Sequence, residues 1–169
     1  MPRKSNVTRV MTFFSASPDP YYQIRAEPAH PVAIEFLSLW REEARTRTLI
    51  VGKDIPSRTF ARFLSCLTIV EPIDNDTDCR IRVAGDAVRQ RYKRDVKDVR
   101  FSDIFSPAVA ADNMMRLREV RRTGIPIIFD AAIIHDDAPS ICYEALLLRI
   151  LAPDEQTYWN IVGIFMLDA

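Results

Sequence analysis

The stretch that decides the fold is residues 126–167, PIIFDAAIIHDDAPSICYEALLLRILAPDEQTYWNIVGIFML. It contains three apolar runs, at 126–134, 140–151 and 158–167, which include many of the β-branched and aromatic residues that favour strands. Short polar segments that contain aspartate and proline separate the runs, and connections of this length favour turns between antiparallel neighbours. We therefore expect a three-stranded antiparallel meander.

A second group of strands lies earlier in the chain. Residues 67–71, LTIVE, form an apolar run, and residues 80–84 alternate polar and apolar side chains. Between them lies the polar cluster Asp74-Asn75-Asp76-Thr77-Asp78, which is typical of a turn. This pattern predicts a β-hairpin.

Helices are predicted before and between these strands. Apolar residues recur at helical spacing over 31–46, which indicates an amphipathic N-terminal helix, and short helices are expected within 85–106. A longer helix is predicted over 107–123, with Ser106 as its cap and Gly124 at its end. Its apolar stripe is expected to be buried, whereas most of its arginines are expected to face water.

Strands joined by tight turns, with helices grouped between them, favour an α+β fold with a five-stranded antiparallel sheet and helices on one face. The 169 residues suffice for one domain, which we place at 31–169. Residues 1–30 contain four prolines and no apolar period, so we expect a flexible N-terminal arm there.

The order of elements resembles the PAS fold, and residues 32–168 resemble the PAS-like proteins of alphaproteobacteria. Three motifs support the resemblance: the Trp-bearing helix FLSLWR at 36–41, Asp54-Ile55-Pro56 before the first strand, and Arg82-Val83-Ala84-Gly85 at the end of the second. One departure is the segment KDVR at 97–100, where relatives commonly have a glycine. The resemblance implies a bacterial sensory or signalling module that acts by protein contact.

The resemblance also implies a cavity between the sheet and the helices, where a small apolar ligand would bind. The candidate lining residues are apolar or aromatic, with one amide as a polar anchor: Phe101, Phe105, Asn113, Met114, Leu117 and Tyr143. Ordinary core packing is the alternative for each of them. In resembling proteins the N-terminal helix pairs with its symmetry mate, so Phe36, Leu37 and Trp40 are the candidates for a homodimer interface.

Composition narrows the partners and the location. The 23 basic and 23 acidic side chains cancel, so we expect neither a nucleic acid nor a membrane as a partner. The basic segment 80–100 could meet an acidic partner or a phosphate-bearing second messenger, and an ordinary solvated helix surface is the alternative. Three cysteines, an odd number, are typical of a reducing compartment, and we expect the protein to be cytoplasmic.

No cofactor or metal is expected. The resemblance would place a haem-binding histidine on helix 107–123, which has none, and the flavin-type Asn-Cys-Arg core is also missing from the sequence. The turn at 74–78 resembles the start of a calcium loop, but Cys79 and Gly85 occupy the positions that need glycine and glutamate. His135 beside Asp136 is interpreted as a turn residue.

Two other functions stay open from the sequence. One is an enzyme with a cone-shaped, steroid-isomerase-like α+β fold, in which Asp130 or Glu144 would be a base in an apolar cavity. The other is a purely structural dimerisation domain. We expect a protein that is not an enzyme.

Overall fold

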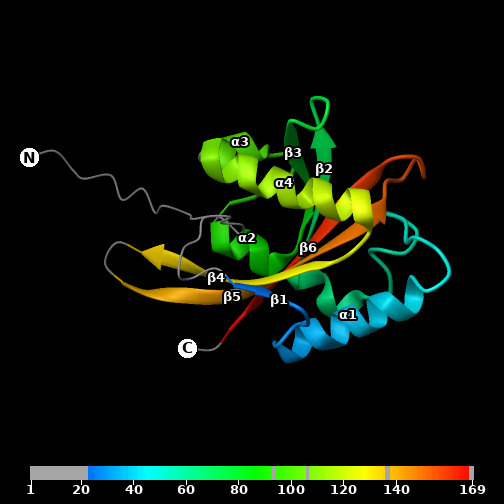
Figure 1. The fold of residues 1–169 in the computed structure, drawn as a ribbon, viewed down its shortest axis with the longest axis horizontal. Coiled ribbons are helices and arrows are strands. Elements are labelled where there is room, and N and C mark those ends of the chain that lie inside the picture. The colour runs from blue at the N-terminus through cyan, green and yellow to red at the C-terminus, as the bar shows by residue number, and fades with distance from the viewer. Residues whose placement is uncertain (1–22, 93, 106, 136–137, 168–169) are drawn as a thin grey trace, which may run out of the picture.

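The computed structural model describes residues 23–92, 94–105, 107–135 and 138–167. One antiparallel sheet in the order β1-β4-β5-β6-β2-β3 runs through the domain (Figure 1). Its strands are β1 (Gln23–Arg25), β2 (Leu67–Ile73), β3 (Asp78–Ala84), β4 (Ile127–His135), β5 (Ala138–Leu151) and β6 (Tyr158–Met166). The helices are α1 (Pro31–Glu43), the 3-10 helix η1 (Ala61–Cys66), α2 (Asp86–Tyr92), α3 (Phe101–Ile104) and α4 (Pro107–Thr123).

The α+β class, the antiparallel pairing, the hairpin and the meander are confirmed, but the sheet has six strands rather than five. The additional strand is β1, which pairs with β4 so that Ile24 lies opposite Phe129. A strand of three residues is too short to show an alternating pattern, so β1 could not be predicted from the sequence. Residues 1–22 of the expected arm, which spans 1–30, lie outside the described residues.

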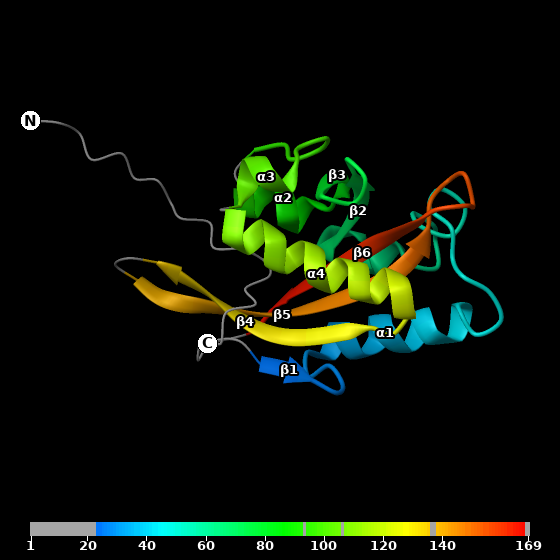
Figure 2. The same ribbon diagram turned by 45° about the horizontal axis from the view of Figure 1, so that its top comes forward.

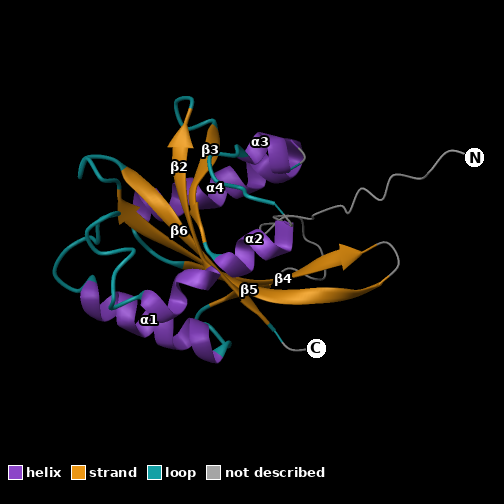
Figure 3. Ribbon diagram, turned by 180° about the vertical axis from the view of Figure 1, so that it is seen from behind, coloured by secondary structure: helices purple, strands orange, loops and turns teal. Residues whose placement is uncertain are grey.

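The sheet is covered on both faces, as Figure 2 shows. Residues of β5 alternate between the faces, so Tyr143 and Leu147 pack under α4 while Leu146 and Leu148 pack under α1. We call these two apolar clusters the α4-side core and the α1-side core. Helices α2, α3 and α4 share one face as predicted, and α1 covers the opposite one (Figure 3).

Helix α1 begins where the sequence predicts and ends three residues earlier than the predicted residue 46, at Glu43. His30 is its N-cap, and the imidazole Nδ1 accepts a hydrogen bond from the Val32 amide at 3.1 Å. Helix α4 has its predicted bounds, and Gly124 follows it with φ +71°, the left-handed conformation that ends many helices. Ser106, the expected cap of α4, lies outside the described residues.

Two of the motifs that support the family resemblance have a structural role, through Asp54 and Gly85. Asp54 accepts hydrogen bonds from the Ile50 amide at 2.8 Å and from Arg47, and the Arg47 hydrogen bond lowers the pKa of this carboxyl below its ordinary value. Gly85 lies against η1 so closely that a Cβ there would be 2.2 Å from the Leu64 carbonyl oxygen. The close approach itself therefore requires glycine at the exit from β3.

Candidate functional site

The six side chains predicted to line a ligand site gather on one face of the sheet. Five of them belong to the α4-side core: Phe101, Phe105, Met114, Leu117 and Tyr143. Asn113, the sixth, is buried on α4 beside Met114. The rings of Phe101 and Phe105 meet edge to face, with centroids 5.1 Å apart. The candidate site is therefore a buried apolar region between α3, α4 and the sheet, with one amide in it.

The Asn113 side chain is the anomaly in this core. It is 0% exposed, and neither its Nδ2 nor its Oδ1 has a hydrogen-bond partner within the described part of the chain. Leaving a buried polar group unpaired costs about 1–3 kcal/mol, so folded proteins pair nearly all such groups. Asn113 is therefore a buried amide whose hydrogen-bonding capacity the described residues leave unused.

Arg116 lies one helical turn beyond Asn113 and is one of two buried arginines of α4, so the prediction that most arginines of this helix face water is wrong. The residue is 7% exposed, and its guanidinium carbon lies 5.0 Å from the centre of the Phe129 ring. Arg121 of the same helix is also buried. Arg121 follows the spacing of the apolar stripe, because it lies four residues after Leu117. This spacing is the signal that could have predicted that Arg121 is buried.

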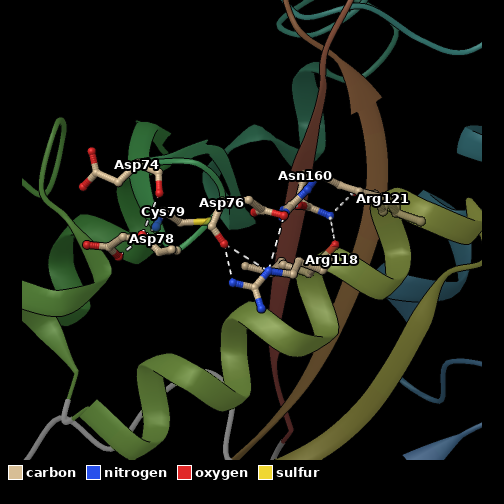
Figure 4. Close-up of polar contacts among 10 residues, drawn as sticks. Asp74, Asp76, Asp78, Cys79, Arg118, Arg121 and Asn160 are labelled. Atoms are coloured by element: carbon tan, nitrogen blue, oxygen red, sulfur yellow. Dashed lines mark hydrogen bonds and ion pairs between the residues drawn. The ribbon is translucent and has the colours of Figure 1, made fainter.

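The aspartate-rich turn between β2 and β3 is clamped onto the helices, as Figure 4 shows. Asp74 pairs with Arg100 at 2.8 Å, and Asp78 accepts a hydrogen bond from the Ser102 hydroxyl at 2.7 Å. Asp76 contacts both Arg118 and Arg121 of α4. No group of three potential metal ligands occurs among the described residues. Instead of a freely solvated loop, this turn is an anchoring point for α3 and α4.

Arg121 extends that anchor into the centre of the sheet (Figure 4). Its guanidinium donates to Asp76 and to the Oδ1 of Asn160, a fully buried residue of β6. The Nδ2 of Asn160 lies 3.3 Å from the Leu117 carbonyl oxygen and 3.5 Å from that of Leu148. Hairpin, α4 and sheet are thus joined by one polar bridge, which is buried at Arg121 and Asn160 and partly exposed at Asp76.

Cys79 lies beside this bridge, and its thiol is unreactive near neutral pH. Burial raises the pKa of its thiol to about 12, although the nearby Arg121 acts in the opposite direction. The thiol therefore stays protonated near neutral pH, and a protonated thiol is a poor nucleophile.

Asp130 and Glu144, the candidate bases of an enzyme, lie on the opposite face, where the chain enters α1. They are paired positions on β4 and β5. Glu144 is 0% exposed, and its two oxygens accept hydrogen bonds from the Ala29 amide at 2.7 Å and the His30 amide at 3.0 Å. Asp130 accepts a hydrogen bond from Arg25 of β1 at 2.8 Å. This geometry assigns both carboxylates to holding the N-terminal segment on the sheet.

The three candidate dimer residues are buried by their own chain. Phe36, Leu37 and Trp40 form part of the α1-side core, where the Phe36 ring lies 5.2 Å from that of Phe63. The outer side of α1 carries Ile34, which is 48% exposed. It borders a surface groove of about 380 Å³ lined by Glu27, Pro28, Ile34, Leu37, Ser38 and Arg41.

Local ion pairs neutralise several of the basic side chains in segment 80–100. Arg80 binds Glu71 at 2.9 Å, Arg82 binds Asp98 at 3.1 Å, and Arg89 binds Asp86. Such exposed pairs contribute little to stability, but they reduce the positive field that the sequence indicates. No helix in the described ranges is long and apolar enough to cross a membrane.

Comparison with known proteins supports the architecture described above. A family model described as a PAS domain matches residues 29–166, which is most of the chain. No curated protein and no solved structure matched the chain. The family match begins just before α1 and ends at the last residue of β6, so it includes both cores. The chain belongs to the PAS domain family.

Proposed function

We propose that this protein is a sensory or signalling module that binds a small, mainly apolar ligand in the α4-side core and acts by protein contact. PAS domains are sensory modules in general, and the observation that supports a ligand is the unpaired amide of Asn113 among buried apolar side chains. In a purely structural dimerisation domain, nothing would compensate the cost of burying that amide unpaired. The free thiols of Cys66 and Cys79 support our inference of a cytoplasmic location.

The fold offers a physical route from the ligand to a protein surface. Asn113 and Arg121 belong to the same helix, so a ligand that moves or stiffens α4 at Asn113 also acts on the bridge from Arg121 to Asp76 and Asn160. That bridge ends at an exposed hairpin turn on one side and in the central sheet on the other. A shift of α4 would therefore change the surface that a regulatory protein meets.

We infer that the protein forms a homodimer through the outer side of α1. The support is the exposed Ile34 next to a groove on the same helix, because a two-fold axis brings each such residue to the groove of the other copy. Light scattering on Ile34→Glu tests this inference. We expect dimers for the wild type and for Ile125→Glu, a matched change at an exposed isoleucine after α4, and monomers for Ile34→Glu. A monomeric wild type at high micromolar concentration would contradict the inference.

Native mass spectrometry of protein purified without denaturation tests the ligand. We expect an additional mass that is retained in the native spectrum and lost on denaturation. Asn113→Leu, which removes the amide at similar volume, should lose the additional mass, and Met115→Leu should keep it because Met115 is exposed on α4. A wild-type spectrum with the bare chain mass alone would count against a bound ligand.

A further inference from the structure

We propose that the ligand carries a carboxamide or lactam group, whose carbonyl and N–H pair with the two free positions of Asn113. This inference rests on the proposed function. The side-chain amide of asparagine offers N–H donors on Nδ2 and acceptor lone pairs on Oδ1. Both atoms are fully enclosed, and both lack a partner among the described residues. The missing group must therefore bring a donor and an acceptor side by side.

Most other common polar groups satisfy only half of this requirement, and a hydroxyl offers its donor and its acceptors on one atom, so it cannot form two parallel hydrogen bonds. An ester, ether or ketone has acceptors alone, so the Oδ1 of Asn113 would stay unpaired. An ammonium group has donors alone and would leave Nδ2 unpaired. A carboxylate also has acceptors alone, and its lone pairs would face those of Oδ1. A planar amide fulfils both needs through two parallel hydrogen bonds, the arrangement in which a buried amide loses least on leaving water.

The neighbouring Arg116 makes a carboxylate the strongest competitor. Its guanidinium is buried one helical turn from Asn113 and is always charged. A carboxylate would gain from this cation but would still not serve Oδ1, whereas an amide carbonyl can accept from Nδ2 while its N–H serves Oδ1. The two groups therefore predict opposite orders of affinity for an acid and its amide.

The walls of the site define the rest of the ligand. Phe101, Phe105 and Met114 are apolar, and methionine adapts its shape to what it contacts. A body of aliphatic or aromatic carbon suits these walls. Octanamide is a suitable probe, with methyl heptanoate as an ester with the same number of heavy atoms that lacks the N–H donor, and octanoate as the charged acid.

Isothermal titration calorimetry of the full chain with these three probes, after removal of any retained molecule, tests the inference. We expect octanamide to bind at least about ten times more tightly than methyl heptanoate and octanoate, because only octanamide pairs both atoms of Asn113. In Asn113→Leu the preference of amide over ester should fall to about one, and in Met115→Leu it should stay at the wild-type value.

The outcomes separate this inference from the proposed function. If the ester binds as tightly as the amide, or octanoate binds most tightly, the amide inference is overturned while a ligand-binding module stands. A molecule retained by the native protein that lacks an N–H beside a carbonyl overturns it equally. If no probe binds and the native protein retains no molecule, the proposed function of ligand binding is itself refuted.

Discussion

Replacing Glu144 by glutamine tests the assignment of this carboxylate to the entry of α1. Each carboxylate oxygen accepts one backbone N–H, and the Nε of Arg25 lies 3.7 Å from Oε2. Glutamine keeps one acceptor and turns an NH₂ group toward the second N–H. The change removes one charge-assisted hydrogen bond and leaves a buried donor unpaired, at about 1–3 kcal/mol each. Removing the buried negative charge offsets part of this cost, so we expect the free energy of unfolding to fall by about 2–4 kcal/mol.

Urea denaturation followed by circular dichroism measures this loss as a fall in the free energy of unfolding. Native-state hydrogen exchange should show faster exchange at the amides of Ala29 and His30. Asp130→Asn is the matched control, and we expect it to cost less than about 1 kcal/mol because the pair with Arg25 is partly exposed. A catalytic carboxylate without compensating donors would give the opposite sign, since removing its buried charge stabilises the fold. A Glu144→Gln protein as stable as the wild type would refute our assignment.

Three further predictions differ in their physical cause. Gly85→Ala should destabilise by about 3 kcal/mol or more, because its Cβ would lie 2.2 Å from the rigid Leu64 carbonyl oxygen. Gly124→Ala should cost only about 1–2 kcal/mol for its positive φ, because the Arg149 guanidinium, 2.6 Å from the added Cβ, is the end of a flexible side chain and can shift. Thermal unfolding compares the two variants. The Cys79 thiol loses its proton from about pH 9 in the unfolded chain but only near pH 12 in the folded protein. The free energy of unfolding should therefore fall as the pH rises past 9, by about 1.4 kcal/mol at pH 10. Urea titrations measure this fall, which Cys79→Ala should lack. Asn113→Leu should raise the free energy of unfolding of ligand-free protein by about 1 kcal/mol or more, and a loss of stability would show that the amide is already paired.

Local signals in the sequence predicted most elements of the fold. Pro107 and Gly124 bound α4 because one residue suits a first helical turn and the other suits a left-handed exit, and both effects depend only on neighbouring residues. The meander was predictable because its three strands follow one another with short turns. Strand β1 was missed since three residues carry no period, and its place on β4 depends on a partner more than 100 residues away.

The site shows the same division between local and distant information. Asn113 was predictable as a polar residue within an apolar stripe, a mismatch visible on the helix itself. Its lack of a partner depends on every element packed around it, so the sequence could not show it. The apolar residues around Glu144 in the sequence predict a buried carboxylate, but the backbone amides that bind it lie 114 and 115 residues away in the sequence. Its role therefore became clear only in three dimensions.

A crystal structure of the natively purified protein, at a resolution that shows ordered water, tests the central claim most directly. We expect density for an organic molecule in the α4-side core, within hydrogen-bond distance of both the Nδ2 and the Oδ1 of Asn113. An Asn113 amide that contacts only water or groups of its own chain would contradict the account of this protein as a ligand-binding sensory module.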